Sequence, residues 1–264
     1  MLTDRAWLQA DWPMSDKIVA GASTRFGGNS TAPALAENNV GLNVGDVPSV
    51  VQGNRQALAR MIAGQNGSAI IEPVNVQWLH QVHGSDCIYV GKDSDLTAAP
   101  QADAMWTDQP GLALAIQSAD CVPVVMTDSA GRLIGAAHGG WRGLVAGVLP
   151  KLVGCMPTQA GNLTAWVGPC IGKAYFEVGA EVWRPVERIC ADAVDPHPSD
   201  SGKRLVDLPL LAQRQLQACG VKAVFQSSLC SYTGAEFYSH RQATHERGPG
   251  AQTGRMATFI CRMA

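Results

Sequence analysis

One short stretch of the chain, Leu133 to Val153, limits the fold more than any other. It begins with an apolar run, Leu133–Ala137, that is typical of a strand. The glycine-rich turn His138-Gly139-Gly140-Trp141-Arg142 follows, and Gly143–Val153 then has the composition of a helix. Glycines let the backbone approach a ligand closely, and a helix that begins beyond them favours an anion. A strand, a glycine turn and a helix in direct succession predict an α/β fold.

The rest of the chain alternates strand-like and helix-like segments irregularly. Strands are expected at Ile18–Thr24, Val76–His80, Ile88–Val90, Leu112–Gln117, Val122–Thr127, Leu163–Val167, Ala223–Gln226 and Ala257–Cys261, and helices at Val50–Ile62, Gly179–Ile189 and Leu208–Cys219. Pro123 predicts a sheet edge or a strand start, because proline cannot donate a ladder hydrogen bond. Asn38–Asp46 and Asp195–Lys203 are expected to be loops, and neither resembles a domain boundary. We therefore expect one domain over residues 1–264, a mixed β-sheet sandwich with packed helices.

Composition excludes several classes of function. The chain has 264 residues, 46% of them apolar and 16% charged, as expected for a globular protein with a real core. A net charge of −2 provides no electrostatic footprint for nucleic acid or an anionic membrane. No apolar run approaches the roughly 18 residues of a membrane span, and the start of the chain does not resemble a secretory signal. The eight cysteines form no C-x-x-C pair and are expected to be reduced thiols of a cytoplasmic protein. No particular oligomeric state is indicated.

Three residues in short, glycine- or acid-flanked motifs are candidates for a metal site. His83 lies in Gln81-Val-His-Gly84, Cys121 follows Asp120, and His138 opens the glycine turn. Two imidazoles and one thiolate can fill three corners of a tetrahedral zinc site, and the open fourth corner is typical of catalytic zinc. Taken singly, each has an ordinary interpretation, because a lone cysteine is usually a small core residue and a lone histidine a hydrogen-bonded structural group. His80 is a rival ligand, and we prefer His83 because Gly84 follows it.

Several arginines near glycine turns could hold an anion. Arg142 adds a planar donor fork to the turn after His138. Arg25 precedes a second glycine loop, which lacks the spacing of a P-loop or a dinucleotide-binding turn. Arg241 and Arg255 flank a Gly-Pro-Gly loop near the end of the chain, and either could contact an anion. An exposed turn with a solvated arginine is the alternative at each of these positions.

The ordered motifs together resemble one known family. They are Arg25-Phe-Gly-Gly, Gln81-Val-His-Gly, Ala119-Asp-Cys121, His138-Gly-Gly-Trp-Arg-Gly, Gly168-Pro-Cys-Ile-Gly and Thr253-Gly-Arg-Met-Ala. This set is similar to the laccase-domain family, called multicopper polyphenol oxidase and also described as a purine nucleoside phosphorylase family. It includes proteins described as peptidoglycan editing factors. The resemblance spans nearly the whole chain.

The resemblance implies a site and a reaction. It implies that His83, Cys121 and His138 bind zinc, and that Arg241 in Tyr238-Ser-His-Arg241 contributes to activity. The implied reactions are phosphorolysis of adenosine, inosine and methylthioadenosine and hydrolytic deamination of adenosine, so the partners are a nucleoside and phosphate. Arg25, Arg142 and Arg241 would then hold phosphate, and Asp120 would assist substrate or metal. The chain departs from the pattern after Arg241, where Ala243 to Gln252 is expected to form a longer loop.

Other reactions stay open at this point. The resemblance also implies a fold related to toxin-type deamidases with a Cys-His pair, so Cys121 as nucleophile and His138 as base could make a thiol hydrolase that edits peptidoglycan precursors. Copper could occupy the same donors, because it outranks zinc in affinity. A copper-dependent polyphenol oxidase is disfavoured, because the chain has six histidines and no His-x-His pair. A non-enzymatic binding module would not need so many polar, glycine-rich motifs.

Overall fold

Two mixed β-sheets and a small third sheet form the framework of the protein, for which a computed structural model describes residues 5–65 and 72–263. The five-stranded sheet has the order β1 (Trp7–Gln9), β2 (Ile18–Ser23), β14 (Met256–Arg262), β6 (Leu112–Ser118), β3 (Asn75–Gln77). The six-stranded sheet has the order β13 (Ala223–Gln226), β9 (Leu163–Val167), β7 (Val122–Asp128), β8 (Ile134–Gly139), β5 (Ala104–Thr107), β4 (Cys87–Tyr89). The small sheet has the order β10 (Glu177–Val178), β12 (Arg204–Val206), β11 (Val194–Pro196).

The two large sheets pack face to face, and each is also covered on its outer face. Along β6, Leu114 and Ile116 contact the other sheet, whereas the intervening Ala113 and Ala115 belong to a separate outer cluster. This alternation follows from the period of two along a strand. Because both faces of the central strands are buried, their sequences are almost continuously apolar.

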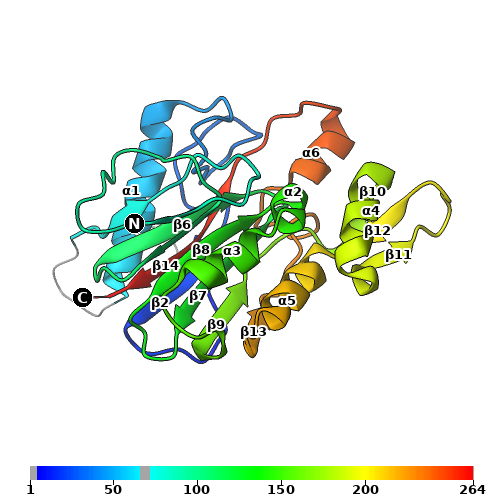
Figure 1. Ribbon diagram of the computed structural model, residues 1–264. Helices are drawn as coiled ribbons and strands as arrows, with labels where there is room; N and C mark the ends of the chain where they lie inside the picture. Colours follow the sequence, from blue (N-terminus) through cyan, green and yellow to red (C-terminus); the bar gives the residue numbers. More distant parts are fainter. Residues whose placement is uncertain (1–4, 66–71, 264) are drawn as a thin grey trace.

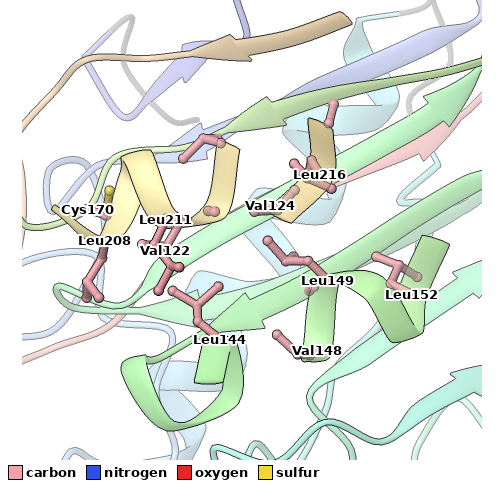
Figure 2. Packing of buried hydrophobic residues seen from close by; sticks show 14 of the residues in the cluster. Val122, Val124, Leu144, Val148, Leu149, Leu152, Cys170, Leu208, Leu211 and Leu216 are labelled. Atoms are coloured by element: carbon pink, nitrogen blue, oxygen red, sulfur yellow. The ribbon is translucent and has the colours of Figure 1, made fainter. Parts of the chain in front are cut away.

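Helices cover the two outer faces (Figure 1). The helices of the described residues are α1 (Pro48–Gly64), α2 (Trp141–Val145), α3 (Val148–Cys155), α4 (Ala180–Ile189), α5 (Leu208–Ala218) and α6 (His240–Arg247), with 3-10 turns at Ala160–Asn162, Lys173–Tyr175 and Ala191–Ala193. Helix α4 lies beside the small sheet. Leu58 and Ile62 of α1 pack on the five-stranded sheet. Leucines of α3 and α5, among them Leu149 and Leu211, pack on β7 of the six-stranded sheet (Figure 2). No helix in the described ranges is both long and apolar enough to cross a membrane.

Strand β7 corrects the expectation that Pro123 marks a sheet edge. The strand does start beside Pro123, but it lies between β8 and β9 near the centre of the sheet. Pro123 faces His138 in the register, and the His138 N–H donates to the Asp103 carbonyl on its other side. The pair therefore needs no hydrogen bond from residue 123, and the Pro123 carbonyl accepts from Gly168 N–H.

Two other segments differ from the sequence-based expectation. The helix expected at Gly143–Val153 is two helices, because Gly147 adopts a left-handed conformation with φ of 83° between α2 and α3. The loop expected at 243–252 is helical up to Arg247, since α6 begins at the Ser239 cap and ends at Gly248. The short strands β1, β5, β10, β11 and β12 fall where no strand was predicted. Strand β11 includes Asp195 and Pro196 of the loop expected at Asp195–Lys203.

Candidate metal centre

Three segments bring His83, Cys121 and His138 together at one end of the two large sheets. His83 lies in the loop before β4, Cys121 directly precedes β7, and His138 is in β8. Their ligand atoms all lie within 4.8 Å of one another, and Cys121 Sγ is 3.8 Å from His83 Nε2. Zinc bonds of about 2.0–2.3 Å in a tetrahedron place neighbouring donor atoms about 3.5 Å apart. The trio therefore fits a metal ion after only a small contraction.

Asp103 holds two members of the trio, His83 and His138, in place. Its fully buried carboxylate accepts backbone N–H bonds from Val82, His83 and Gly84 at 2.7–3.1 Å. The same carboxylate lies 2.8 Å from His138 Nδ1. A carboxylate on Nδ1 sets the tautomer and leaves Nε2 as the donor for a metal. Asp103 thus holds the His83 loop and orients the His138 ring at once.

The backbone is strained on both sides of the trio. His83 has a backbone φ of 61° and Asp120 has a φ of 93°, values that residues other than glycine rarely adopt. Such strain persists only where surrounding contacts over-determine the conformation, and it is concentrated at functional sites. The hydrogen bonds of Asp103 supply those contacts for His83.

Asp120 connects Cys121 to segments that are distant in the sequence, among them the start of α6. One carboxylate oxygen accepts from the buried Ser231 hydroxyl at 2.7 Å, and the other accepts from the Arg241 backbone N–H at 2.6 Å. Its carbonyl accepts from Ile171 N–H. Both carboxylate oxygens are therefore engaged inside the protein, so the structure gives Asp120 a positioning role behind Cys121.

Gly140 leaves the space that the His83 ring occupies. A Cβ at residue 140 would lie 2.5 Å from His83 Cδ2 and 3.3 Å from Cys121 Sγ. Real Cβ atoms do not approach carbon this closely, so any larger residue would displace the imidazole. The glycine turn after β8 is thus part of the wall of the metal centre.

The trio perturbs its own ionisation. Burial opposes ionisation of Cys121, but the charge and hydrogen bonds of His138 and His83 outweigh it and lower the thiol pKa to about 6. Burial alone would lower the pKa of His138, yet the Cys121 charge and Asp103 raise it to about 9. A thiolate beside an imidazolium is therefore the favoured metal-free state near neutral pH. A thiolate is the form of cysteine that binds metal.

The trio opens into a cavity of about 490 Å³. His80, Gln81, Arg55, His240 and Arg255 are among the polar residues that line it. Gln81 is itself fixed by two hydrogen bonds to the backbone of Gln117. His80 lines the cavity but does not join the ligand cluster, which contains His83 instead.

Of the four arginines singled out from the sequence, Arg255 lines this cavity and the other three lie elsewhere. Arg25, Arg142 and Arg241 do not line this cavity. Arg25 donates to the Ala36 carbonyl, Arg142 stacks on Trp141, and Arg241 donates to the Glu177 carbonyl. No sequence motif indicates Asp103 or Arg55 as a site residue. Asp103 shows only as a lone acid between two alanines, and Arg55 resembles any polar residue of an amphipathic helix.

The chain is similar to known proteins over nearly its whole length. The family model described as multi-copper polyphenol oxidoreductase laccase matches residues 19–263. The chain belongs to this family. The purine nucleoside phosphorylase YfiH of Escherichia coli K12 is 38% identical over 94% of this chain and 96% of its own length. The purine nucleoside phosphorylase PA4543 of Pseudomonas aeruginosa is 36% identical over 97% of this chain and 98% of its own.

Solved structures show the same fold. The Neisseria meningitidis protein NMB0706 matches with a TM-score of 0.85 and 32% identity, covering 98% of this chain and 100% of that chain. YlmD from Geobacillus stearothermophilus also has a TM-score of 0.85 and 32% identity, covering 100% and 98%. The resemblance found in the sequence motifs and the mixed α/β fold are thereby confirmed.

Proposed function

We propose that this protein is a zinc-dependent purine nucleoside phosphorylase. The observation that carries the proposal is the His83–Cys121–His138 cluster, whose donor atoms face a cavity large enough for a nucleoside. The comparisons support the proposal, because several relatives that match over nearly the full length are named purine nucleoside phosphorylase. Adenosine, inosine and methylthioadenosine are the proposed substrates, with phosphate as co-substrate.

The chain's own residues divide the work at this site. His83, Cys121 and His138 would hold the zinc ion, and Asp103 keeps the His138 ring oriented through Nδ1. When bound, the metal would supply Lewis-acid chemistry to a substrate atom at the open fourth position. Asp120 holds Cys121 and the start of α6 in register through its two engaged oxygens. We also propose deamination of adenosine at this site.

The proposal also covers the protein as a whole. It is that residues 1–264 act as one domain in the cytoplasm on small molecules, without a nucleic-acid partner. Copper is the alternative ion, because nitrogen and sulfur donors bind it more tightly than zinc. Metal analysis of the protein as purified decides between them.

A nucleoside assay tests the reaction. Adenosine, inosine and methylthioadenosine are incubated with the zinc-loaded protein, with and without phosphate. Ribose 1-phosphate or its methylthio analogue should form only with phosphate, and ammonia should be released from adenosine. Base release at an equal rate without phosphate would contradict a phosphorylase. If no ammonia is released while phosphorolysis occurs, only the proposed deaminase activity fails.

A thiol hydrolase that edits peptidoglycan precursors is the second candidate, and one observation favours it. The pKa of Cys121 is lowered to about 6 beside a histidine that is oriented by a carboxylate. This is the arrangement of a cysteine nucleophile, its base and an orienting group. The relation to toxin-type deamidases would then follow. Removal of metal with a chelator separates the two functions, because the phosphorylase loses activity whereas a thiol hydrolase keeps or gains it.

A further inference from the structure

The cavity beside the metal centre is positively charged. Arg55 and Arg255 line it together with His80 and His240. No aspartate or glutamate is among the lining residues within the described part of the chain. Neither arginine takes part in an ion pair formed by the described residues. Two guanidinium groups thus share one concave surface that carries no carboxylate within the described residues.

Arg255 presents its bidentate edge without a protein acceptor. Its Nη1 donates to the carbonyls of Thr253 and Gly254, both at 3.0 Å. Its side chain packs against Gly41, where a Cβ would lie 2.8 Å from Arg255 Cγ. Nε and Nη2 of Arg255 donate no hydrogen bond to any residue in the described ranges 5–65 and 72–263. The Nε and Nη2 pair is the fork that matches two oxygens of a phosphate or carboxylate.

Arg55 is held in a complementary way from helix α1. Its Nε donates to the Val40 carbonyl at 2.9 Å, and its guanidinium stacks on the Trp78 ring at 4.0 Å from the centroid. These two contacts leave both Nη groups without an acceptor among the described residues. The stacked plane immobilises the guanidinium, so little further ordering is needed when an anion binds.

Both guanidinium groups are partly buried, and a bound anion would offset the cost of that burial. Burial lowers the pKa of Arg55 to about 10. Burial also lowers the pKa of Arg255, although the nearby Cys121 and Asp120 charges oppose the shift. In addition, the buried hydroxyl of Ser118, another lining residue, has no hydrogen-bond partner among the described residues. Unpaired buried polar groups of this kind gain most from a polar ligand.

We propose that Arg55 and Arg255 form an oxyanion subsite next to the metal centre, and that its ligand is inorganic phosphate. The identity of the ligand as a co-substrate rests on the proposed phosphorylase function, whereas the subsite itself rests on the two guanidinium groups. It assigns the anion to residues other than Arg25, Arg142 and Arg241, which lie outside the cavity. The cavity of about 490 Å³ leaves room for a nucleoside beside the anion.

Direct binding of inorganic phosphate to the zinc-loaded full-length protein tests the subsite by calorimetry. Arg55→Gln and Arg255→Gln should each weaken phosphate binding by about tenfold or more, because each removes charge-assisted hydrogen bonds. Arg255→Lys should recover only part of the loss, since lysine keeps the charge without the fork. Arg60→Gln is the matched control, because Arg60 is an exposed residue of the same helix and should leave binding unchanged. Zinc content and melting temperature are measured for every variant, and the lysine variants replace any glutamine variant that does not fold.

The kinetic counterpart separates this subsite from the proposed function. If nucleosides are cleaved, the KM for phosphate should rise in the two glutamine variants while the KM for the nucleoside stays within about twofold. If the wild type binds phosphate through both arginines but cleaves no nucleoside, the subsite stands and the phosphorylase proposal fails. Phosphate affinity equal to wild type in Arg55→Gln and Arg255→Gln overturns the subsite. So does a loss of affinity for adenosine 5′-phosphate without a loss for inorganic phosphate, because the anion would then belong to the substrate.

Discussion

Two thiols on either side of Asp120 differ in ionisation because their neighbours differ. Cys121 follows Asp120 directly, and Cys170 lies in the loop whose next residue, Ile171, donates its N–H to the Asp120 carbonyl. Burial and nearby negative charges raise the pKa of Cys170, whereas two imidazoles lower that of Cys121 to about 6. The comparison shows that the neighbouring imidazoles favour the thiolate of Cys121, whereas Cys170 has burial and negative neighbours that favour its thiol.

Replacement of each thiol in turn should give the largest difference between Cys121 and Cys170. Cys121→Ala should lower zinc affinity by more than about a hundredfold, beyond the effect of losing an outer partner, because a ligand is lost. Cys170→Ala is the matched control and should keep zinc at the wild-type ratio. Elemental analysis after dialysis against a weak chelator measures both. Equal zinc content in the two variants would contradict the assigned ligand set.

The two thiols should also differ in reactivity. In metal-free protein at pH 7, Cys121 should react with iodoacetamide at least about a hundredfold faster than Cys170, because only the thiolate is nucleophilic. The Cys121 rate should fall as the pH drops through about 6. Peptide mapping by mass spectrometry follows each site.

Since the pKa of Cys121 is lower in the folded chain, ionised Cys121 stabilises the fold above about pH 8.5, and this contribution is lost as the pH falls through the folded value. An alkylation rate of Cys121 whose midpoint lies at or above pH 8 would show that the imidazoles do not lower the pKa of this thiol.

Asp103 is the buried carboxylate that orients His138 in the cluster with Cys121. Asp103→Asn should lower zinc affinity about 10–100-fold, as expected when the partner of a ligating histidine is altered. It should also destabilise the fold by about 1–3 kcal/mol, because an amide cannot accept all the N–H groups that the carboxylate accepts. Asp93→Asn, at an exposed loop position, is the control. Zinc titration and urea unfolding measure the two effects, and an unchanged zinc affinity would leave Asp103 a purely structural role.

Gly140 is expected to give the smallest effect. Gly140→Ala should weaken zinc binding by about tenfold or less, because the new methyl group must push the His83 ring aside. Gly154→Ala, in α3 with open space around the glycine, should keep zinc and gain up to about 1 kcal/mol of stability. The same competition titration applies to both variants. If Gly140→Ala bound zinc as well as Gly154→Ala does, the ring would have room to move without cost.

The sequence predicts the strands and helices that carry strong apolar patterns, and it indicates His83, Cys121 and His138 through the motifs around them. It does not reveal Asp103, because this residue reaches His138 only through the antiparallel pairing of β5 with β8. Strand β5 itself is four residues long and has no alternating pattern that would predict it.

The arginines show a second limit of sequence reasoning. Arg142 and Arg25 stand in glycine turns that suggest anion binding, yet their side chains stack on aromatic rings outside the cavity. Arg55 enters the cavity because α1 packs on the five-stranded sheet, a tertiary contact without a local motif. The position of Pro123 in a central strand has the same origin, since only the register shows that residue 123 needs no N–H.

X-ray absorption at the zinc edge tests the central claim most directly. The wild-type protein as purified should show about one sulfur neighbour at about 2.3 Å and two imidazole nitrogens at about 2.0–2.1 Å. Cys121→Ala should lose the sulfur shell, and Cys170→Ala should keep it. A metal shell made only of nitrogen and oxygen in the wild type, or a sulfur shell that survives Cys121→Ala, would contradict the account.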